Sequence, residues 1–187
     1  MAEHYVAAPN WEWWILGYFF CAGLAGGLYT LATLLRLTGT PANARIVRVS
    51  YLWILPLCVI CGIFLTIDLG KPLDFWHMMI NTTPGEGGLN FKPWSPISLG
   101  TWALLLFSLF GFIAFIENWQ LGRATGTAAT RGNGGMIVLH IIGSLLGIFL
   151  ASYTGVVLSV SNQPVWSDSW AIGALFVASA FSGAAAV

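Results

Sequence analysis

Charge is the property that this 187-residue chain has least of. Only 7% of its residues are charged, whereas 57% are hydrophobic and the mean hydropathy is +0.79. A soluble domain carries roughly 25% charged residues, so this composition excludes an ordinary soluble protein. Seven basic and seven acidic residues give a net charge of zero, which argues against a nucleic-acid partner. We therefore expect an integral membrane protein in contact with lipid.

Residues that bind metals or haem are also scarce. The three histidines are predicted to lie in a polar lead, a loop and a span, so no two of them could face each other as axial haem ligands. We expect neither haem nor a metal in this chain, and no nucleophile–base–acid set indicates a hydrolase. All three cysteines lie in apolar runs: Cys21, Cys58 and Cys61. Thiols in such runs behave as small apolar groups, so we expect no disulfide framework.

Long apolar runs are what the chain has instead. A helix needs about 20 apolar residues to cross a bilayer, and such runs cover about 13–36, 48–67, 97–116 and 136–160. A fifth begins after Asp168 and has no charged or aromatic anchor behind it, so we expect further helices to follow or the chain to be part of a longer protein.

The fold class predicted from these runs is an all-α polytopic membrane protein. Residues 1–12 would form an outer N-terminal lead and residues 13–160 a four-helix transmembrane bundle. Residues 161–187 would form a loop and the start of a fifth transmembrane helix. Five of the seven basic residues lie in the connections 36–48 and 117–135. The positive-inside rule then places the amino terminus outside.

Small residues indicate where the helices should pack closely. The first span contains Gly23–Gly27, and the fourth has a small residue at every fourth position from Gly143 to Gly155. Such stripes let neighbouring helices approach each other.

Polar side chains at membrane depth are costly and are therefore candidates for function. Ala22, Ala25 and Tyr29 each fall within about 40° of Tyr18 on a helix, which would turn Tyr18 toward the bundle interior. A lipid-facing or interfacial tyrosine is the alternative. Tyr153 is expected at a similar depth, roughly 10 Å from the outer end of the fourth span.

Ionisable residues form the second group of candidates. Asp68 closes the second span and could handle protons, with His77 nearby and Trp76 as a stacking face. The alternative for Asp68 is a solvated acid paired with Lys71. His140, in the inner half of the fourth span, is either a hydrogen-bonded core histidine or part of a proton path.

Four segments, in the same order, resemble the NrfD/PsrC family of membrane subunits, which occur in polysulfide-reductase-type and related quinone-linked oxidoreductases. Trp14–Gly27 resembles the first span of that family, Asp68–Trp76 its acidic segment after the second span, Ser95–Trp102 its Ser-Pro-x-x-x-Gly-x-Trp entry into the third, and Ser152–Trp166 its Tyr-x-Gly and Pro-x-Trp pair.

The resemblance implies a haem-free subunit with two helix bundles, of which this chain supplies the first and the start of the second. It implies a quinone, either menaquinone or ubiquinone, bound in the first bundle near an adjacent iron–sulfur subunit. A larger peripheral redox subunit is also implied, with a molybdopterin-containing one as a candidate. The expected location is a bacterial or archaeal inner membrane.

The resemblance also assigns roles to single residues. Tyr153 matches the quinone-site tyrosine of the family, and Asp68 matches an acidic residue of proton movement. Tyr18 stands where polysulfide reductase has a quinone-site histidine. A tyrosine keeps a hydrogen-bond donor, but its ordinary pKa near 10 is far from neutral, which puts proton coupling at that position in doubt.

The sequence thus predicts a quinone-binding subunit that exchanges electrons with an iron–sulfur partner and acts within an oxidoreductase complex rather than as a stand-alone enzyme. One alternative is a structural anchor without a quinone site. Another is a transporter component, disfavoured because His140 is the one ionisable group expected deep inside a span. The predicted quinone-binding residues are Tyr18, Tyr153 and Trp76, and the predicted proton-transfer residues are Asp68, His77 and His140.

Overall fold

The computed structural model describes residues 12–39, 41–81, 87–124, 134–160 and 169–187. Four helices are long and apolar enough to cross a membrane, which confirms the all-α polytopic class. A shorter apolar helix, α6, follows them. The helices are α1 (Trp13–Thr38), α2 (Ala44–Asp68), α3 (Pro96–Ala124), α4 (Gly134–Ser159) and α6 (Ile172–Ala186).

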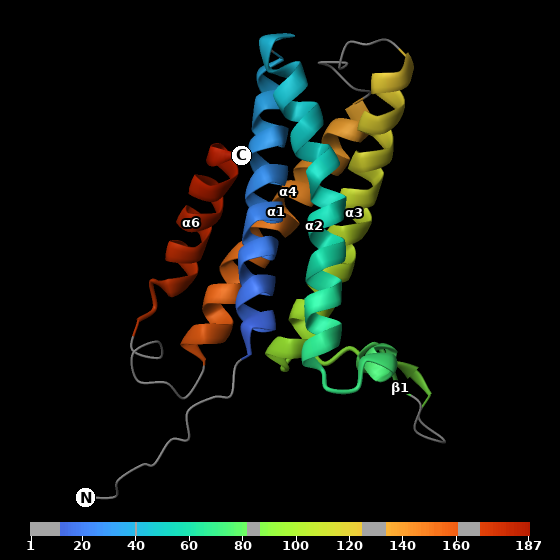
Figure 1. The fold of residues 1–187 in the computed structure, drawn as a ribbon, viewed down its shortest axis with the longest axis vertical. Helices are drawn as coiled ribbons and strands as arrows, with labels where there is room; N and C mark the ends of the chain where they lie inside the picture. The colour runs from blue at the N-terminus through green and yellow to red at the C-terminus, as the bar shows by residue number, and fades with distance from the viewer. Residues whose placement is uncertain (1–11, 40, 82–86, 125–133, 161–168) are drawn as a thin grey trace, which may run out of the picture.

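The long helices form a bundle in which consecutive helices run in opposite directions (Figure 1). Helix α1 packs against α2, α4 and α6, whereas α3 packs against α2 and α4. Helix α1 is consequently the central helix of the described residues, and it has the largest share of buried residues among the four spans. The core contains the α1 face predicted from its spacing, because Tyr18, Ala22, Ala25 and Tyr29 are all buried.

Glycines set the closest helix contacts, as the small-residue stripes predicted. A Cβ on Gly26 of α1 would lie 3.0 Å from the carbonyl carbon of Gly147 in α4. A Cβ on Gly155 of α4 would lie 2.8 Å from the Cα of Gly173 in α6. Because real Cβ atoms do not approach backbone so closely, these crossings require glycine.

The connections lie at the two ends of the bundle. Gly39, with φ of 66°, ends α1 in the left-handed region, and the 3-10 helix η1 (Pro41–Asn43) leads into α2. At the opposite end, α2 is followed by the 3-10 helix η2 (Pro72–Met78) and an antiparallel pair of two-residue strands, β1 (Ile80–Asn81) and β2 (Gly88–Leu89). These elements lie beside the end of the bundle where α1 begins (Figure 1).

We call the end where α1 begins and α2 ends the tyrosine end, since Tyr18 and Tyr153 lie toward it. We call the opposite end, where α1 ends and α2 begins, the arginine end. The predicted loop at 161–168 and the predicted lead lie outside the described residues, apart from Glu12, which precedes α1.

Candidate functional site

Tyr18 lies on the interior face of α1, about one and a half turns from the start of the helix. Its side chain is 5% exposed, and its ring lies 5.6 Å from the ring of Phe19. Cys61 of α2 contacts the backbone carbonyl of Tyr18, with 3.9 Å between sulfur and oxygen. Among the described residues, no group forms a hydrogen bond with the Tyr18 hydroxyl. A buried phenol of this kind retains one donor for a ligand.

Tyr153 reaches the same end from α4 and is half-buried. Its hydroxyl donates a hydrogen bond to the carbonyl of Pro96, the first residue of α3. Gly100 makes room for this ring, because a Cβ at that position would lie 2.5 Å from ring carbons of Tyr153. The hydroxyls of Tyr18 and Tyr153 are close enough to interact electrostatically. The structure therefore brings the two predicted tyrosines to one region between α1, α3 and α4.

Asp68 is the last residue of α2 and is half-buried. It makes no ion pair with Lys71, although both residues are described, and Glu12 is a charged group that acts on it electrostatically. An acid without a cationic partner in this position can exchange a proton with water more readily than an acid held in a salt bridge. The solvated Asp68–Lys71 pair that served as the alternative is therefore not formed.

Trp76 and His77 lie on η2, outside the bundle. Trp76 is 41% exposed, His77 is exposed as well, and the two rings contact each other at a centroid distance of 3.9 Å. Within the described residues, neither ring contacts Tyr18 or Tyr153. Their predicted roles in quinone binding and proton transfer remain predictions.

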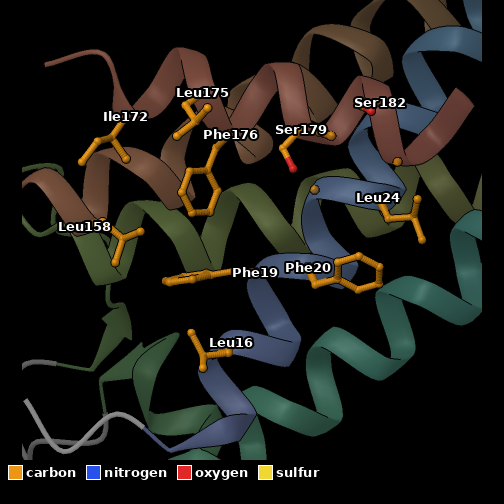
Figure 2. Close-up of a pocket in the computed structure, with 13 residues that line it drawn as sticks. Leu16, Phe19, Phe20, Leu24, Leu158, Ile172, Leu175, Phe176, Ser179 and Ser182 are labelled. Carbon is orange, nitrogen blue, oxygen red and sulfur yellow. The ribbon is translucent and has the colours of Figure 1, made fainter. Parts of the chain in front are cut away.

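An apolar groove of about 720 Å³ runs between α1 and α6 (Figure 2). Phe19 and Phe176 meet edge to face across it, with 6.1 Å between their centroids. Ser179 and Ser182 are its polar side chains. The volume falls within the range of about 300–1,000 Å³ typical of small-molecule sites. Since Phe19 also contacts Tyr18, the groove begins beside the tyrosine end of α1.

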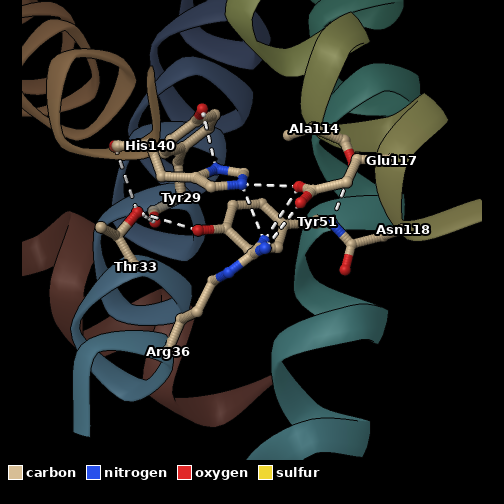
Figure 3. A network of polar contacts seen from close by, with 8 residues as sticks. All are labelled: Tyr29, Thr33, Arg36, Tyr51, Ala114, Glu117, Asn118 and His140. Carbon is tan, nitrogen blue, oxygen red and sulfur yellow. Dashed lines mark hydrogen bonds and ion pairs between the residues drawn. The ribbon is translucent and has the colours of Figure 1, made fainter. Parts of the chain in front are cut away.

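Toward the arginine end, the bundle contains a buried cluster of polar and charged side chains (Figure 3). Arg36 of α1 and Glu117 of α3 form a two-pronged ion pair, with nitrogen–oxygen distances of 2.6 and 2.9 Å. Their side chains are 4% and 14% exposed. His140 of α4 places Nε2 2.7 Å from Glu117 Oε2 and 2.7 Å from Arg36 Nη1.

Hydroxyl groups surround this ion pair and its histidine. The Tyr29 hydroxyl lies 3.4 Å from His140 Nδ1, and the Tyr51 hydroxyl lies 3.0 Å from Thr33 Oγ1. The ring of Tyr51 also packs on the imidazole, with 4.6 Å between centroids. Each of the four long helices contributes at least one of these six residues. His140 is thus a hydrogen-bonded core histidine whose Nε2 faces two charged neighbours and whose Nδ1 faces a phenol.

Reasoning from the sequence alone misses most of this cluster. The predicted spans 13–36 and 97–116 place Arg36 and Glu117 at span ends, as charged flanks. His140 is then the one ionisable residue expected deep inside a span. That expectation is wrong because α1 continues to Thr38 and α3 to Ala124, so both residues lie inside their helices. A signal is present: Tyr29, Thr33 and Arg36 follow one another at helical spacing, which predicts a shared polar face.

The residues at the tyrosine end have the chemical character that a quinone requires. In the described part of the protein, no three His, Cys, Asp or Glu side chains come together to hold a metal ion. A quinone requires an apolar slot for its ring and tail, together with a donor for a carbonyl oxygen. The Tyr18 hydroxyl and the adjoining groove have these properties.

Comparison with known proteins decides the family. The family model described as "Polysulphide reductase, NrfD" matches residues 2–187. The chain belongs to the NrfD family. It is 27% identical to Protein NrfD of Escherichia coli strain K12 over 95% of its own length and 58% of that protein.

Two further relatives of this NrfD-family protein are named as parts of reductases. It is 29% identical to the C component of the polysulfide reductase of Wolinella succinogenes, over 92% of its own length and 55% of that relative. It is 25% identical to the C component of the selenate reductase of Mesobacillus selenatarsenatis, over 61% of its own length and 24% of that relative. The protein thus spans little more than half the length of the NrfD and polysulfide reductase relatives. No solved structure matches it.

Proposed function

We propose that this NrfD-family chain binds quinone or quinol at the tyrosine end and exchanges electrons with an adjacent iron–sulfur subunit. It would act within an oxidoreductase complex that also contains a larger peripheral redox subunit, with a molybdopterin-containing subunit as the candidate. Two relatives named as parts of reductases support the assembly. The four apolar helices support the membrane location.

The observation that carries the quinone site is the Tyr18 phenol. Its side chain is buried at 5% exposure, yet none of the described residues accepts a hydrogen bond from its hydroxyl. A quinone carbonyl oxygen at this position would accept a hydrogen bond from that hydroxyl.

Tyr153 and Asp68 would then act differently from Tyr18. The one hydroxyl proton of Tyr153 is engaged by the Pro96 carbonyl, so its oxygen can accept a hydrogen bond from a quinol O–H but cannot also donate. Asp68, half-buried and not paired with Lys71, would take up or supply a proton near the same end. Reduction of a quinone to a quinol consumes two electrons and two protons, and the iron–sulfur partner would be the source of the electrons.

The groove between α1 and α6 suits an isoprenoid tail. Its wall is apolar apart from two serines, and it lies next to Phe19, whose ring contacts Tyr18. The head group would lie inside the four-helix bundle and the tail would cross between α1 and α6. We infer that the chain lies in a bacterial or archaeal inner membrane. The tyrosine end would face the outer side of that membrane and the arginine end the inner side.

A titration with a fluorescent quinol-analogue inhibitor tests this proposal. The experiment uses membranes that contain the assembled complex and compares wild type with Tyr18→Phe. Loss of one hydrogen bond to the ligand should raise the dissociation constant by roughly three- to tenfold, the equivalent of about 0.6–1.4 kcal/mol. Thr101→Val is a matched control, because its hydroxyl donates within its own helix to the Ile97 carbonyl. The dissociation constant of the control should be unchanged.

Two results would contradict the proposal. An equal dissociation constant in Tyr18→Phe and wild type would place the quinone elsewhere. A complete absence of saturable binding in an intact complex would favour the second candidate, a structural anchor without its own quinone site. The exposed Phe75 and Trp76 of η2, together with the exposed Ile80 and Leu89 of the strand pair that follows, favour an anchoring contact, because they offer apolar surface at the end of the bundle.

A further inference from the structure

A buried ion pair is weak support for stability. Replacement of such groups by well-packed apolar residues is often neutral or stabilising, because charges lose their hydration on burial. In a membrane span the cost of ionisable residues is higher still, so they are functional candidates by default. The Arg36–Glu117–His140 cluster therefore calls for a role beyond holding helices together.

The geometry around one atom points to that role. His140 Nε2 lies 2.7 Å from Arg36 Nη1, which can only donate, and 2.7 Å from Glu117 Oε2, which can only accept when ionised. If Nε2 carries a proton, it donates to Glu117 and cannot accept from Arg36. If Nε2 is bare, its single lone pair accepts from Arg36, and it makes no hydrogen bond with Glu117. One proton position therefore determines which contact is satisfied.

The neighbours of the cluster can follow a moving proton. His140 Nδ1 faces the Tyr29 hydroxyl at 3.4 Å, and a hydroxyl can rotate between donating and accepting. Arg36 Nε is buried and has no partner among the described residues, so the guanidinium is not fully fixed by hydrogen bonds. A cluster that served purely as a clamp would be expected to satisfy its buried donors.

Access to the cluster is uneven. The side chain of Glu117 is 14% exposed, compared with 4% for Arg36 and 2% for His140. Glu117 is therefore the member through which a proton from water can enter or leave. The charged and titratable groups that face His140 are Arg36 and Tyr29 from α1, Tyr51 from α2 and Glu117 from α3 (Figure 3).

We propose that Glu117, His140 and Arg36 form a proton-binding site that exchanges one proton with the aqueous phase at the arginine end. The site without the proton holds a guanidinium, a carboxylate and a neutral imidazole, with a net charge of zero. Uptake of one proton from water converts the imidazole to imidazolium beside the carboxylate, and the net charge becomes +1. Release returns the same proton by way of Glu117.

This site is separate from the quinone site. Tyr29 lies about three helical turns from Tyr18, roughly 16 Å along α1. Proton binding at the cluster can be measured with no quinone present. A negative result would therefore leave the quinone site standing, and an absent quinone site would not remove the proton site.

Histidine-selective ¹⁵N NMR on the full protein in lipid nanodiscs tests the proposal. The sequence has three histidines, and the signals of His140 are those lost in His140→Gln. Between pH 5 and pH 9, both ring nitrogens of His140 should change between the neutral and the doubly protonated form. In Glu117→Gln, which retains an amide oxygen for Arg36, proton affinity at His140 should fall tenfold or more, because an opposite charge at hydrogen-bond distance is lost.

The controls separate proton binding from a structural effect. Asn118→Ala removes a buried side chain next to Glu117 that bonds only within its own helix, to the Ala114 carbonyl, and it should leave the His140 titration unchanged. Glu117→Asp should restore most of the lost affinity. His140 signals that do not change from pH 5 to pH 9 in the folded wild-type protein would overturn the proposal. An unchanged titration in a folded Glu117→Gln variant would also overturn it.

Discussion

Separate and joint removal of Arg36 and Glu117 should reveal how strongly the four helices depend on this pair. The two side chains share two charge-assisted hydrogen bonds of 2.6 and 2.9 Å and are 4% and 14% exposed. Removal of one partner of a buried pair costs about 3–5 kcal/mol, because the other charge stays buried and unpaired. Arg36→Met should fall at the low end, since His140 remains 2.7 Å from the carboxylate and can pair with it when protonated.

Glu117→Leu should fall at the high end of that range, because Arg36 and His140 then face each other without an anion. The double variant Arg36→Met/Glu117→Leu leaves no unpaired charge, so its cost should be close to zero and far below the sum of the two single costs. The free energy of unfolding would be measured by SDS titration in mixed micelles at neutral pH. Arg36→Met combined with Asn118→Leu is the control pair, expected to be additive. Additivity within about 0.5 kcal/mol for Arg36 and Glu117 would refute the coupling.

Three further predictions concern packing. Gly100→Ala should displace the tyrosine ring beside it and weaken quinol-analogue binding several-fold, whereas Gly62→Ala, with no atom within 4 Å of the new Cβ, should leave the binding constant unchanged. Gly26→Ala should lower the free energy of unfolding by about 1–3 kcal/mol, because its Cβ would overlap the α4 backbone, whereas Gly62→Ala should raise it by up to about 1 kcal/mol. The two buried thiols of α2, Cys58 and Cys61, should react with maleimide only after denaturation. Labelling of either thiol in the native protein would contradict its burial.

Most of the fold could be predicted from the sequence because membrane spans leave strong local signals. The four apolar runs matched helices of 25–29 residues, whose ends differ from the ends of the runs by at most eight residues. Glycine stripes predicted that the first and fourth spans would each pack closely against a neighbouring helix, and the structure pairs α1 with α4 where a Cβ added to Gly26 or Gly147 would lie about 3 Å from the facing backbone. The interior face of α1 followed from helical spacing alone.

The buried ion pair could not be found in the same way. Arg36 and Glu117 are 81 positions apart in the sequence, and each lies near the end of an apolar run, where charges usually mark the membrane boundary. The guanidinium and the carboxylate meet His140 only because α1 packs against α2 and α4, while α3 packs against the same two helices. The hydrogen bond of Tyr153 to Pro96, and the lack of any described residue in hydrogen-bond contact with the Tyr18 hydroxyl, likewise depend on packing between helices.

The central claim, that quinone binds between α1 and α4 at the tyrosine end, is tested most directly by photolabelling. Membranes containing the assembled complex would be irradiated with an azidoquinone, and the labelled peptides would be mapped by mass spectrometry. We predict label on the α1 segment around Tyr18 and on the α4 segment around Tyr153, abolished by excess quinone. Label restricted to other segments, or label that excess quinone does not displace, would contradict the account.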